Sequence, residues 1–161
     1  MGLPRSRTAW MANFLSYDGA FCHHEGLVGC RTMTEYREKV GAFGDSSTVG
    51  MLLNYEETYP DAPVLIIERG TEAAIDFGSR VLQADVSAEM QFLKEKMDKI
   101  EGMRVDFDRI DDKLEDIWDY LIGTPYDGQR GSQLSKMNVQ VSNPMNYELD
   151  LSLLEEIHSG F

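Results

Sequence analysis

The chain has 161 residues, 42% of them hydrophobic and 27% charged, and its formal net charge is −13 at pH 7. This length suits a single domain over residues 1–161, in which 144–161 form a polar C-terminal extension or helix. The negative charge makes nucleic acid and anionic membranes unlikely partners. No apolar run approaches the roughly 20 residues that a membrane-spanning helix needs. Because the N-terminus lacks the apolar region of a secretory signal, we expect a cytoplasmic protein with Cys22 and Cys30 as free thiols.

Helical and strand-like patterns alternate along the chain. The strand over 63–67 is the clearest, because its continuous aliphatic run is typical of a parallel strand that is covered on both faces. Before the helix over 49–58, the run Asp45, Ser46, Ser47 and Thr48 supplies N-cap candidates. The predicted elements, in chain order, are a helix over 8–15, a strand over 20–23, a helix over 33–40, a strand over 40–43, a helix over 49–58, a strand over 63–67, a helix over 71–82, a helix from 87, a strand over 103–107 and helices over 110–121 and 149–158.

This alternation predicts an α/β fold, a three-layer sandwich with a parallel sheet and crossover helices. Ligands of such sheets bind beyond the carboxyl ends of the strands. Asp45 and Arg69 both fall at that edge in the predicted arrangement.

The turn before the first predicted helix has the chemistry of an anion site. A turn that leads into a helix directs free backbone N–H groups to one place, and the helix dipole favours an anion there. Arg5 and Arg7 add positive charge beside it. The Walker pattern, with its Lys and Ser/Thr, is absent from the sequence, which disfavours a routine ATPase or GTPase. A solvated basic N-terminus is the alternative interpretation.

The segment 4–10, Pro-Arg-Ser-Arg-Thr-Ala-Trp, resembles the sulfotransferase loop Pro-(Lys/Arg)-Ser-Gly-Thr-Thr-Trp. The segment 59–69, which ends in a buried strand followed by Arg69, is similar to the part of that family that binds the cofactor 3′-phosphate. The resemblance implies a P-loop NTPase-like fold. It also implies transfer of a sulfuryl group from 3′-phosphoadenosine 5′-phosphosulfate to a hydroxyl or amine of a small-molecule acceptor, with no metal.

The same resemblance implies roles for individual residues. Arg5 would hold the sulfuryl or bridging oxygens and take part in catalysis, and Arg69 would hold the 3′-phosphate. The base that takes the acceptor proton would be His24 or Glu25, for which an exposed polar turn is the alternative interpretation. The implied cofactor-binding residues are Arg5, Ser6, Arg7, Thr8, Ala9, Trp10, Arg69 and Ser79.

The sequence departs from the family pattern at three places. Arg7 replaces the family's Gly, Phe77 stands where a Ser is expected, and only Met1, Gly2 and Leu3 precede Pro4. The interpretation is therefore a shortened or divergent member that lacks the first strand, with self-association as an expected consequence. Two other functions stay open: a nucleotide or nucleoside kinase without the Walker Lys, and a non-catalytic interaction protein that keeps the fold.

Overall fold

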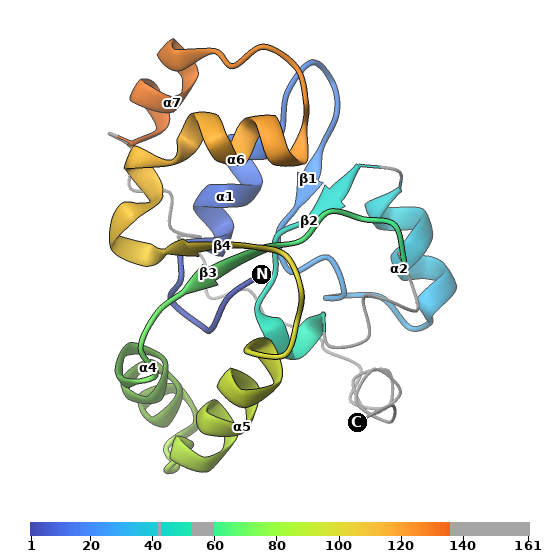
Figure 1. Cartoon of the computed structure of the whole chain (residues 1–161). Coiled ribbons are helices and arrows are strands. Elements are labelled where there is room, and N and C mark those ends of the chain that lie inside the picture. Colours follow the sequence, from blue (N-terminus) through green and yellow to red (C-terminus); the bar gives the residue numbers. More distant parts are fainter. Residues whose placement is uncertain (42, 53–59, 136–161) are drawn as a thin grey trace.

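The computed structural model describes residues 1–41, 43–52 and 60–135 of the chain. They form a mixed α/β structure in which short parallel strands lie between helices (Figure 1). Its elements are α1 (Thr8–Leu15), β1 (Cys22–His23), α2 (Met33–Val40), β2 (Gly44–Asp45), the 3-10 helix η1 (Val49–Met51), β3 (Leu65–Glu68), α4 (Glu72–Leu82), α5 (Ser87–Met97), β4 (Met103–Asp106), the 3-10 helix η2 (Phe107–Asp112), α6 (Leu114–Leu121) and α7 (Gly128–Ser135). No helix in these ranges has the length and apolar character needed to cross a membrane.

The segment 1–3 lies between the two pairs of strands. β1 pairs with β2 and β3 pairs with β4, both in parallel, while Gly2 forms parallel bridges to Thr48 on one side and to Ile67 on the other. The Gly2 carbonyl accepts from Val49 N at 2.8 Å. On the other side, Ile67 N donates to the Met1 carbonyl at 2.9 Å. Residues 1–3 thus occupy the middle of the parallel arrangement, and the loop that follows them begins at its centre.

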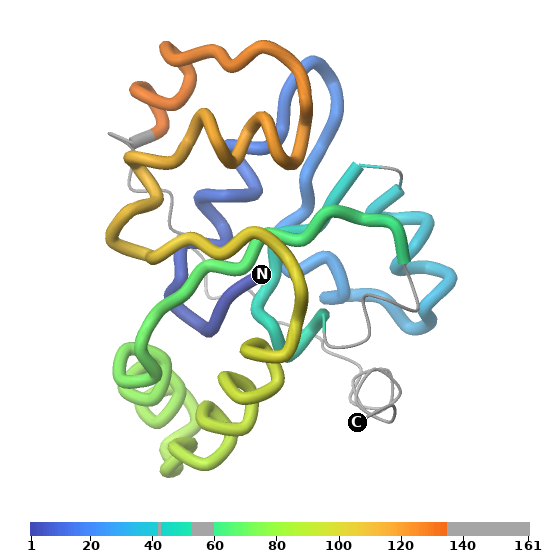
Figure 2. The backbone as a smooth tube through the Cα atoms, viewed as in Figure 1, coloured from blue at the N-terminus to red at the C-terminus, as the bar shows by residue number. Residues whose placement is uncertain are grey.

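Two hydrophobic clusters cover the two sides of these strands. One contains Phe14 and Leu15 of α1 and Ile117 and Trp118 of α6, together with Ile67 of β3. The other is built from residues of α2, η1, α4 and α5 and from Leu3 and Ile66. Because Ile66 and Ile67 are adjacent in β3, their side chains enter opposite clusters. Figures 1 and 2 show α1, α6 and α7 on one side of β3 and β4 and α4 and α5 on the other.

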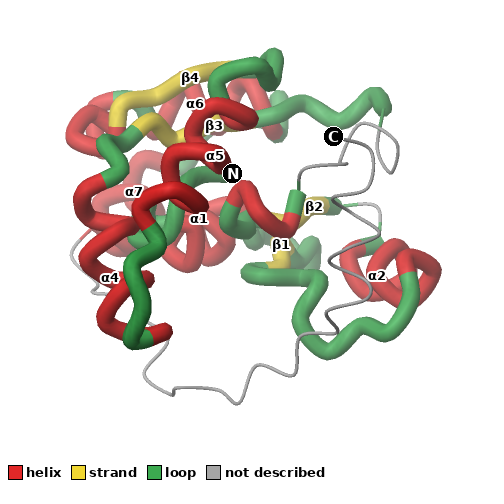
Figure 3. The backbone as a smooth tube through the Cα atoms, turned by 90° about the horizontal axis from the view of Figure 1, so that it is seen from below, coloured by secondary structure: helices red, strands yellow, loops and turns green. Residues whose placement is uncertain are grey.

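β1, β2 and α2 lie together at one side of the molecule, away from α4 and α7, in both Figure 1 and the rotated view of Figure 3. α2 begins with an N-cap, in which Thr32 Oγ1 accepts from Glu35 N at 3.1 Å, while Glu35 Oε2 accepts from N of the preceding residue Arg31 at 2.7 Å. The sequence therefore specifies the start of this helix locally.

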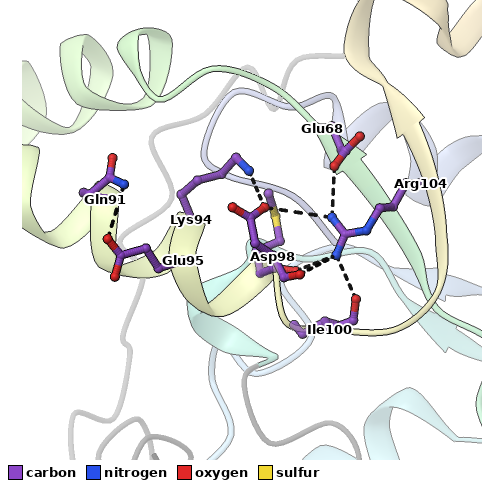
Figure 4. A network of polar contacts seen from close by, with 8 residues as sticks. Glu68, Gln91, Lys94, Glu95, Asp98, Ile100 and Arg104 are labelled. Atoms are coloured by element: carbon purple, nitrogen blue, oxygen red, sulfur yellow. Dashed lines mark hydrogen bonds and ion pairs between the residues drawn. The ribbon is translucent and has the colours of Figure 1, made fainter.

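Arg104 fixes β4 to the end of α5 (Figure 4). Its Nη2 donates to the carbonyl oxygens of Met97, Asp98 and Ile100, and its Nη1 lies 2.9 Å from Glu68 Oε1. The guanidinium thus satisfies carbonyl groups that a helix end leaves without partners. Lys94 also pairs with Asp98 in this network.

α7 closes over α1. Arg130 donates from Nη2 to the carbonyl of Asn13 at 2.6 Å and to that of Ser16, and from Nε to the carbonyl of Phe14 at 3.1 Å. Trp10 Nε1 donates to the Leu134 carbonyl at 2.8 Å. The two helices are therefore joined at both ends of α1 by hydrogen bonds.

The structure confirms most of the expected elements. The helices over 8–15, 33–40 and 71–82, the helix from 87, and the strands over 63–67 and 103–107 correspond to α1, α2, α4, α5, β3 and β4 within one or two residues. Cys22 and Cys30 are free and buried, as expected. The strand expected over 20–23 is only Cys22–His23.

Other expectations need correction. The strand expected over 40–43 lies at 44–45 instead, because Gly41 ends α2 with a φ of 64° and turns the chain. The helix expected over 110–121 is two elements, which Lys113 separates with a φ of −117°. α7 was not expected. The helix expected over 49–58 begins as η1, and its remaining residues after Leu52, together with the helix over 149–158 and the extension over 144–161, lie outside the described residues.

The proposed helix cap before Val49 is also wrong. Thr48 is the N-cap residue of η1, but its side chain makes no capping hydrogen bond. The side chains of Asp45, Ser46 and Ser47 make tertiary contacts instead, which belong to the candidate site.

Candidate functional site

The loop between Leu3 and α1 is a tight turn with two residues in the left-handed conformation. Ser6 N donates to the Leu3 carbonyl at 3.2 Å, and Arg5 and Arg7 have φ angles of 71° and 61°. An alternation of right- and left-handed residues directs neighbouring N–H groups into one concavity, which is a common anion-binding arrangement. Arg7 thus adopts the backbone conformation that glycine normally supplies at this position of the resembling loop.

The N-terminus of α1 is open at this concavity. The first hydrogen bond of the helix runs from Met11 N to the Arg7 carbonyl at 2.9 Å, and the side chain of Arg7, the N-cap residue, makes no capping hydrogen bond. Within the described ranges, the backbone N–H groups of Arg7, Thr8 and Ala9 have no acceptor. Free N–H groups at a helix N-terminus, together with the helix dipole, favour a bound anion.

The hydroxyl of Ser6 is a second polar group of the loop that lacks a hydrogen-bond partner among the described residues. Its side chain is fully buried, and among the described residues its hydroxyl is the buried side-chain polar atom that lacks a hydrogen bond. A buried polar group without a partner costs about 1–3 kcal/mol, so native structures rarely keep one without a reason. A ligand oxygen in the loop is one group that would satisfy it.

The Arg7 side chain leaves the loop. Its guanidinium makes two hydrogen bonds to the Asp111 carboxylate, at 3.1 and 3.2 Å, and lies 4.3 Å from the centre of the Trp10 ring. Trp10 itself is held by its bond to Leu134. The Arg7 guanidinium is therefore held by Asp111 and by the face of Trp10.

Arg69 and Arg5 lie at the same edge of the strands. Arg69, directly after β3, donates from Nη1 to the Arg5 carbonyl, and its guanidinium lies 3.9 Å from the centre of the Phe107 ring. The Arg5 guanidinium lies 5.5 Å from the ring centre of Phe77. An ion pair of Arg69 with Glu68 or Glu72 was the alternative interpretation, but none of the ion pairs among the described residues includes Arg69, and Glu68 pairs with Arg104 at 2.9 Å.

Phe77 and Ser79 both belong to α4, where the resemblance would place a hydroxyl for the 3′-phosphate. Phe77 contacts the loop through Arg5. Ser79 is half-buried, and none of the hydrogen bonds among the described residues joins it to the loop. On this side of the site, aromatic rings and guanidinium groups therefore meet where a hydroxyl was expected.

His24 and Glu25 follow β1 and are not an exposed turn. Glu25 is buried with a φ of 53°, and its carboxylate accepts from Thr48 N at 3.0 Å and from Thr48 Oγ1 at 3.5 Å. His24 is half-buried, and its Nδ1 lies 2.8 Å from the Ser46 carbonyl. Since a carbonyl oxygen can only accept, Nδ1 carries a proton in this contact and Nε2 of the neutral ring has a free lone pair.

Ser46 connects His24 with the loop. Its backbone carbonyl holds the His24 ring, while its buried hydroxyl donates to the carbonyl of Thr8, the first residue of α1, at 2.8 Å. One residue after β2 therefore bridges the candidate base and the open helix N-terminus. In the sequence, Ser46 belongs to the run of expected N-cap residues over 45–48, and nothing in that run indicates its contacts with His24 and Thr8.

Asp45 organises the turn that carries His24 and Glu25. Its carboxylate accepts from Ser47 Oγ at 2.5 Å, from Gly26 N at 3.2 Å and from Tyr36 Oη at 2.9 Å. A Cβ at Gly26 would lie 2.7 Å from Asp45 Oδ2 and 2.9 Å from Val40 Cγ2. Only glycine fits there without displacing these groups.

Burial controls the protonation of two groups near this turn. It raises the pKa of the Glu25 carboxyl above its ordinary value of 4.5, and Asp45 acts in the same direction, while His24 and the bonds from Thr48 oppose the shift. Burial, with a further contribution from Asp45, raises the pKa of the Cys22 thiol to about 12. Cys22 is therefore a poor nucleophile. Within the described residues, no group of three or more His, Cys, Asp or Glu side chains is arranged to hold a metal ion.

Sequence reasoning placed the loop, Arg69, His24 and Glu25 in the site, and the structure brings them to the same edge of the strands. It missed Ser46, Phe107 and Asp111, which contact His24, Arg69 and Arg7.

Comparison with protein family models gives no match, and comparisons with curated proteins and with solved structures give none either.

Proposed function

We propose that the chain is a sulfotransferase-like transferase with a three-layer, P-loop NTPase-like fold. The loop over 4–8 binds the phosphosulfate of 3′-phosphoadenosine 5′-phosphosulfate, which supplies the sulfuryl group, and the acceptor is a hydroxyl or amine of a small molecule. The middle position of residues 1–3 among parallel strands supports this fold, because the loop then follows the central strand. The hydrophobic clusters on both sides of β3 support it too.

The observation that carries the proposal is the open loop itself. Three consecutive N–H groups, over 7–9, lack an acceptor within the described ranges, and the neighbouring Ser6 hydroxyl is buried without a partner. Donors that are fixed before the ligand binds stabilise developing negative charge without reorganisation. The residues present therefore fit a phosphosulfate group.

The arginines of the site have separable roles. Arg5 is exposed and contacts only the face of Phe77 among the interactions described for its side chain, so its guanidinium is free to turn toward the anion. Arg69 holds the Arg5 carbonyl, which keeps the left-handed turn in place, and supplies positive charge at the carboxyl end of β3. Arg7 is occupied by Asp111 and positions Trp10.

His24 is the base in this proposal, and Glu25 is a positioning residue. The bond from Nδ1 to the Ser46 carbonyl leaves Nε2 to take the acceptor proton as the acceptor oxygen or nitrogen attacks sulfur, while the bond from sulfur to the bridging oxygen breaks and adenosine 3′,5′-bisphosphate leaves with that oxygen. Glu25 is buried and its carboxylate is bound to Thr48, so it fixes the turn from within. This assignment separates the two residues that the sequence left as alternatives.

Calorimetric titration with adenosine 3′,5′-bisphosphate tests the anion site. We expect metal-independent binding that Arg5→Ala weakens by about 10- to 150-fold, the range for loss of a charged hydrogen bond. Arg37→Ala is the matched control, because Arg37 is an exposed residue on α2. A folded chain that binds no bisphosphate would contradict the proposal, and ADP binding only with Mg²⁺ would favour the kinase hypothesis instead.

Turnover tests the base separately. With the phosphosulfate donor and a panel of small hydroxyl and amine acceptors, His24→Ala should abolish release of the bisphosphate and leave its binding within twofold. Glu25→Gln keeps an acceptor for Thr48 N and should retain turnover. If Glu25→Gln abolished turnover while His24→Ala retained it, the two roles would be reversed.

A further inference from the structure

Ser46 is the residue at which the end of β1 meets the start of α1. Its N–H donates to the His23 carbonyl at 2.8 Å, which continues the pairing of β1 with β2. Its carbonyl accepts from His24 Nδ1 at 2.8 Å, and its hydroxyl donates to the Thr8 carbonyl at 2.8 Å. Ser46 is buried, and a hydrogen bond in the protein interior is stronger than one in water. Its backbone and side chain are therefore fixed at three points.

The peptide group between Thr8 and Ala9 connects Ser46 with the anion loop. Its carbonyl oxygen belongs to Thr8 and accepts from Ser46 Oγ. Its N–H belongs to Ala9 and is one of the loop donors that have no acceptor within the described ranges. An anion that accepts from this N–H polarises the peptide group and makes its carbonyl a stronger acceptor. Occupation of the loop therefore strengthens the bond that holds the Ser46 hydroxyl.

The place of the Ser46 carbonyl decides which nitrogen of His24 carries the proton. A neutral imidazole has one N–H donor and one nitrogen with a free lone pair. While Nδ1 donates to the Ser46 carbonyl, the lone pair is on Nε2. A ring that loses this acceptor populates both tautomers, and the Nε2–H tautomer has no lone pair on Nε2 to take a proton. Displacement of Ser46 would therefore reduce the fraction of chains in which His24 can act as the base.

We propose that Ser46 is a positioning residue, whose hydroxyl links the anion loop to His24 so that a bound anion favours the Nδ1–H form of the ring. The inference rests on the proposed function for the role of His24 as the base. The link itself requires only that an anion occupies the loop. Binding of the sulfuryl donor and readiness of the base are thus coupled events.

The tautomer of His24 measures this link without turnover. Long-range 1H–15N NMR spectra at about pH 8.5, above the ordinary pKa of histidine, distinguish the two neutral forms, and His24→Gln identifies the signals of His24 among the three histidines. We expect the Nδ1–H form to dominate in the unsubstituted chain. Saturation with inorganic pyrophosphate should increase its fraction and slow hydrogen exchange at the Ala9 amide.

Ser46→Ala keeps the carbonyl that holds His24 and removes the hydroxyl that fixes its position. The Nδ1–H fraction should fall and no longer respond to pyrophosphate. Thr32→Ala is the control, because it removes the hydroxyl that caps α2, which also lowers stability but lies outside the path from the loop to His24. This control should keep both the Nδ1–H form and its response.

Kinetics separate positioning from binding. With the phosphosulfate donor, Ser46→Ala should lower kcat by about 10- to 100-fold, since a displacement of about 1 Å can cost about 100-fold in rate. Because coupling between two sites is reciprocal, bisphosphate binding should weaken as well, by about fivefold.

Three results would overturn the inference: a dominant Nε2–H form in the unsubstituted chain, an unchanged tautomer fraction on saturation with pyrophosphate, or the same fraction in Ser46→Ala as in the unsubstituted chain. The first two are measured without any substitution, so they apply even if Ser46→Ala does not fold. Pyrophosphate that raises the Nδ1–H fraction in a chain that neither binds the bisphosphate nor turns over the donor would support this inference and contradict the proposed function.

Discussion

The unpartnered hydroxyl of Ser6 predicts that one substitution has opposite effects on stability and on binding. Ser6→Ala removes a buried polar atom that has no hydrogen bond in the free chain. We expect it to raise the free energy of unfolding by about 1–3 kcal/mol, the cost of an unsatisfied buried group. For a chain of this size, each kcal/mol corresponds to a rise in Tm of about 2–4 °C.

The same substitution should weaken anion binding. If the hydroxyl donates to a ligand oxygen in the loop, its loss removes a charged hydrogen bond of about 1.5–3 kcal/mol, or about 10- to 150-fold in Kd. Urea unfolding and thermal melts measure the first effect, and calorimetry with adenosine 3′,5′-bisphosphate measures the second. The two measurements use the same protein sample under the same buffer conditions.

Ser46→Ala is the matched control for Ser6→Ala, because Ser46 is equally small and buried but its hydroxyl donates to the Thr8 carbonyl. We expect this change to lower the free energy of unfolding by about 1 kcal/mol. If Ser6→Ala destabilised the chain as much as Ser46→Ala and left bisphosphate binding unchanged, the argument from the unpartnered hydroxyl would be refuted.

Further outcomes follow from other contacts. Both Arg7→Gly and Arg7→Ala remove the hydrogen bonds to Asp111, but only alanine keeps the strain of the left-handed φ of 61°. Arg7→Gly should therefore have a free energy of unfolding about 1 kcal/mol higher than Arg7→Ala, as measured by urea unfolding. Equal stabilities of the two variants would contradict this. Because the pKa of Glu25 is raised in the fold, the stability it contributes is present below pH 4.5 and lost as the pH rises through the folded pKa. Glu25→Gln should therefore gain stability relative to the unsubstituted chain above pH 4.5, whereas a constant difference in urea unfolding would argue against the shift. With a pKa of about 12, Cys22 should be alkylated at pH 8 about 1,000-fold more slowly than an ordinary thiol with a pKa of 9, as measured by mass spectrometry.

Local signals in the sequence predicted much of the fold. The aliphatic run at 63–67 and the periodic apolar residues over 8–15 and 33–40 specify their elements within a few residues, and these became β3, α1 and α2. The loop could be placed for the same reason, because a turn that leads into a helix is itself a local pattern. The position of Arg69 at the edge of the strands could be predicted too, because Arg69 comes directly after the clearest strand.

The parts that sequence reasoning missed depend on residues far apart in the chain. Arg7 pairs with Asp111, 104 positions away, and this pair explains how an arginine occupies a left-handed position without filling the loop. Ser46 has the composition of a helix cap, and only its place beside Thr8 makes it a link between His24 and the loop. The middle position of residues 1–3 rests on bridges to Thr48 and Ile67, which three residues of sequence do not encode.

The contact between α7 and α1 has a consequence for the order of folding. Arg130 and Leu134 bind the two ends of a helix that lies 114 to 124 positions earlier in the chain. Closing a loop of this length is slow compared with helix formation, so contacts of this kind form late. On a ribosome, α1 would emerge long before the residues that fix its ends. Until most of the protein had been made, the nascent chain would therefore carry Arg5, Arg7 and Trp10 without the contacts that fix α1 to α7.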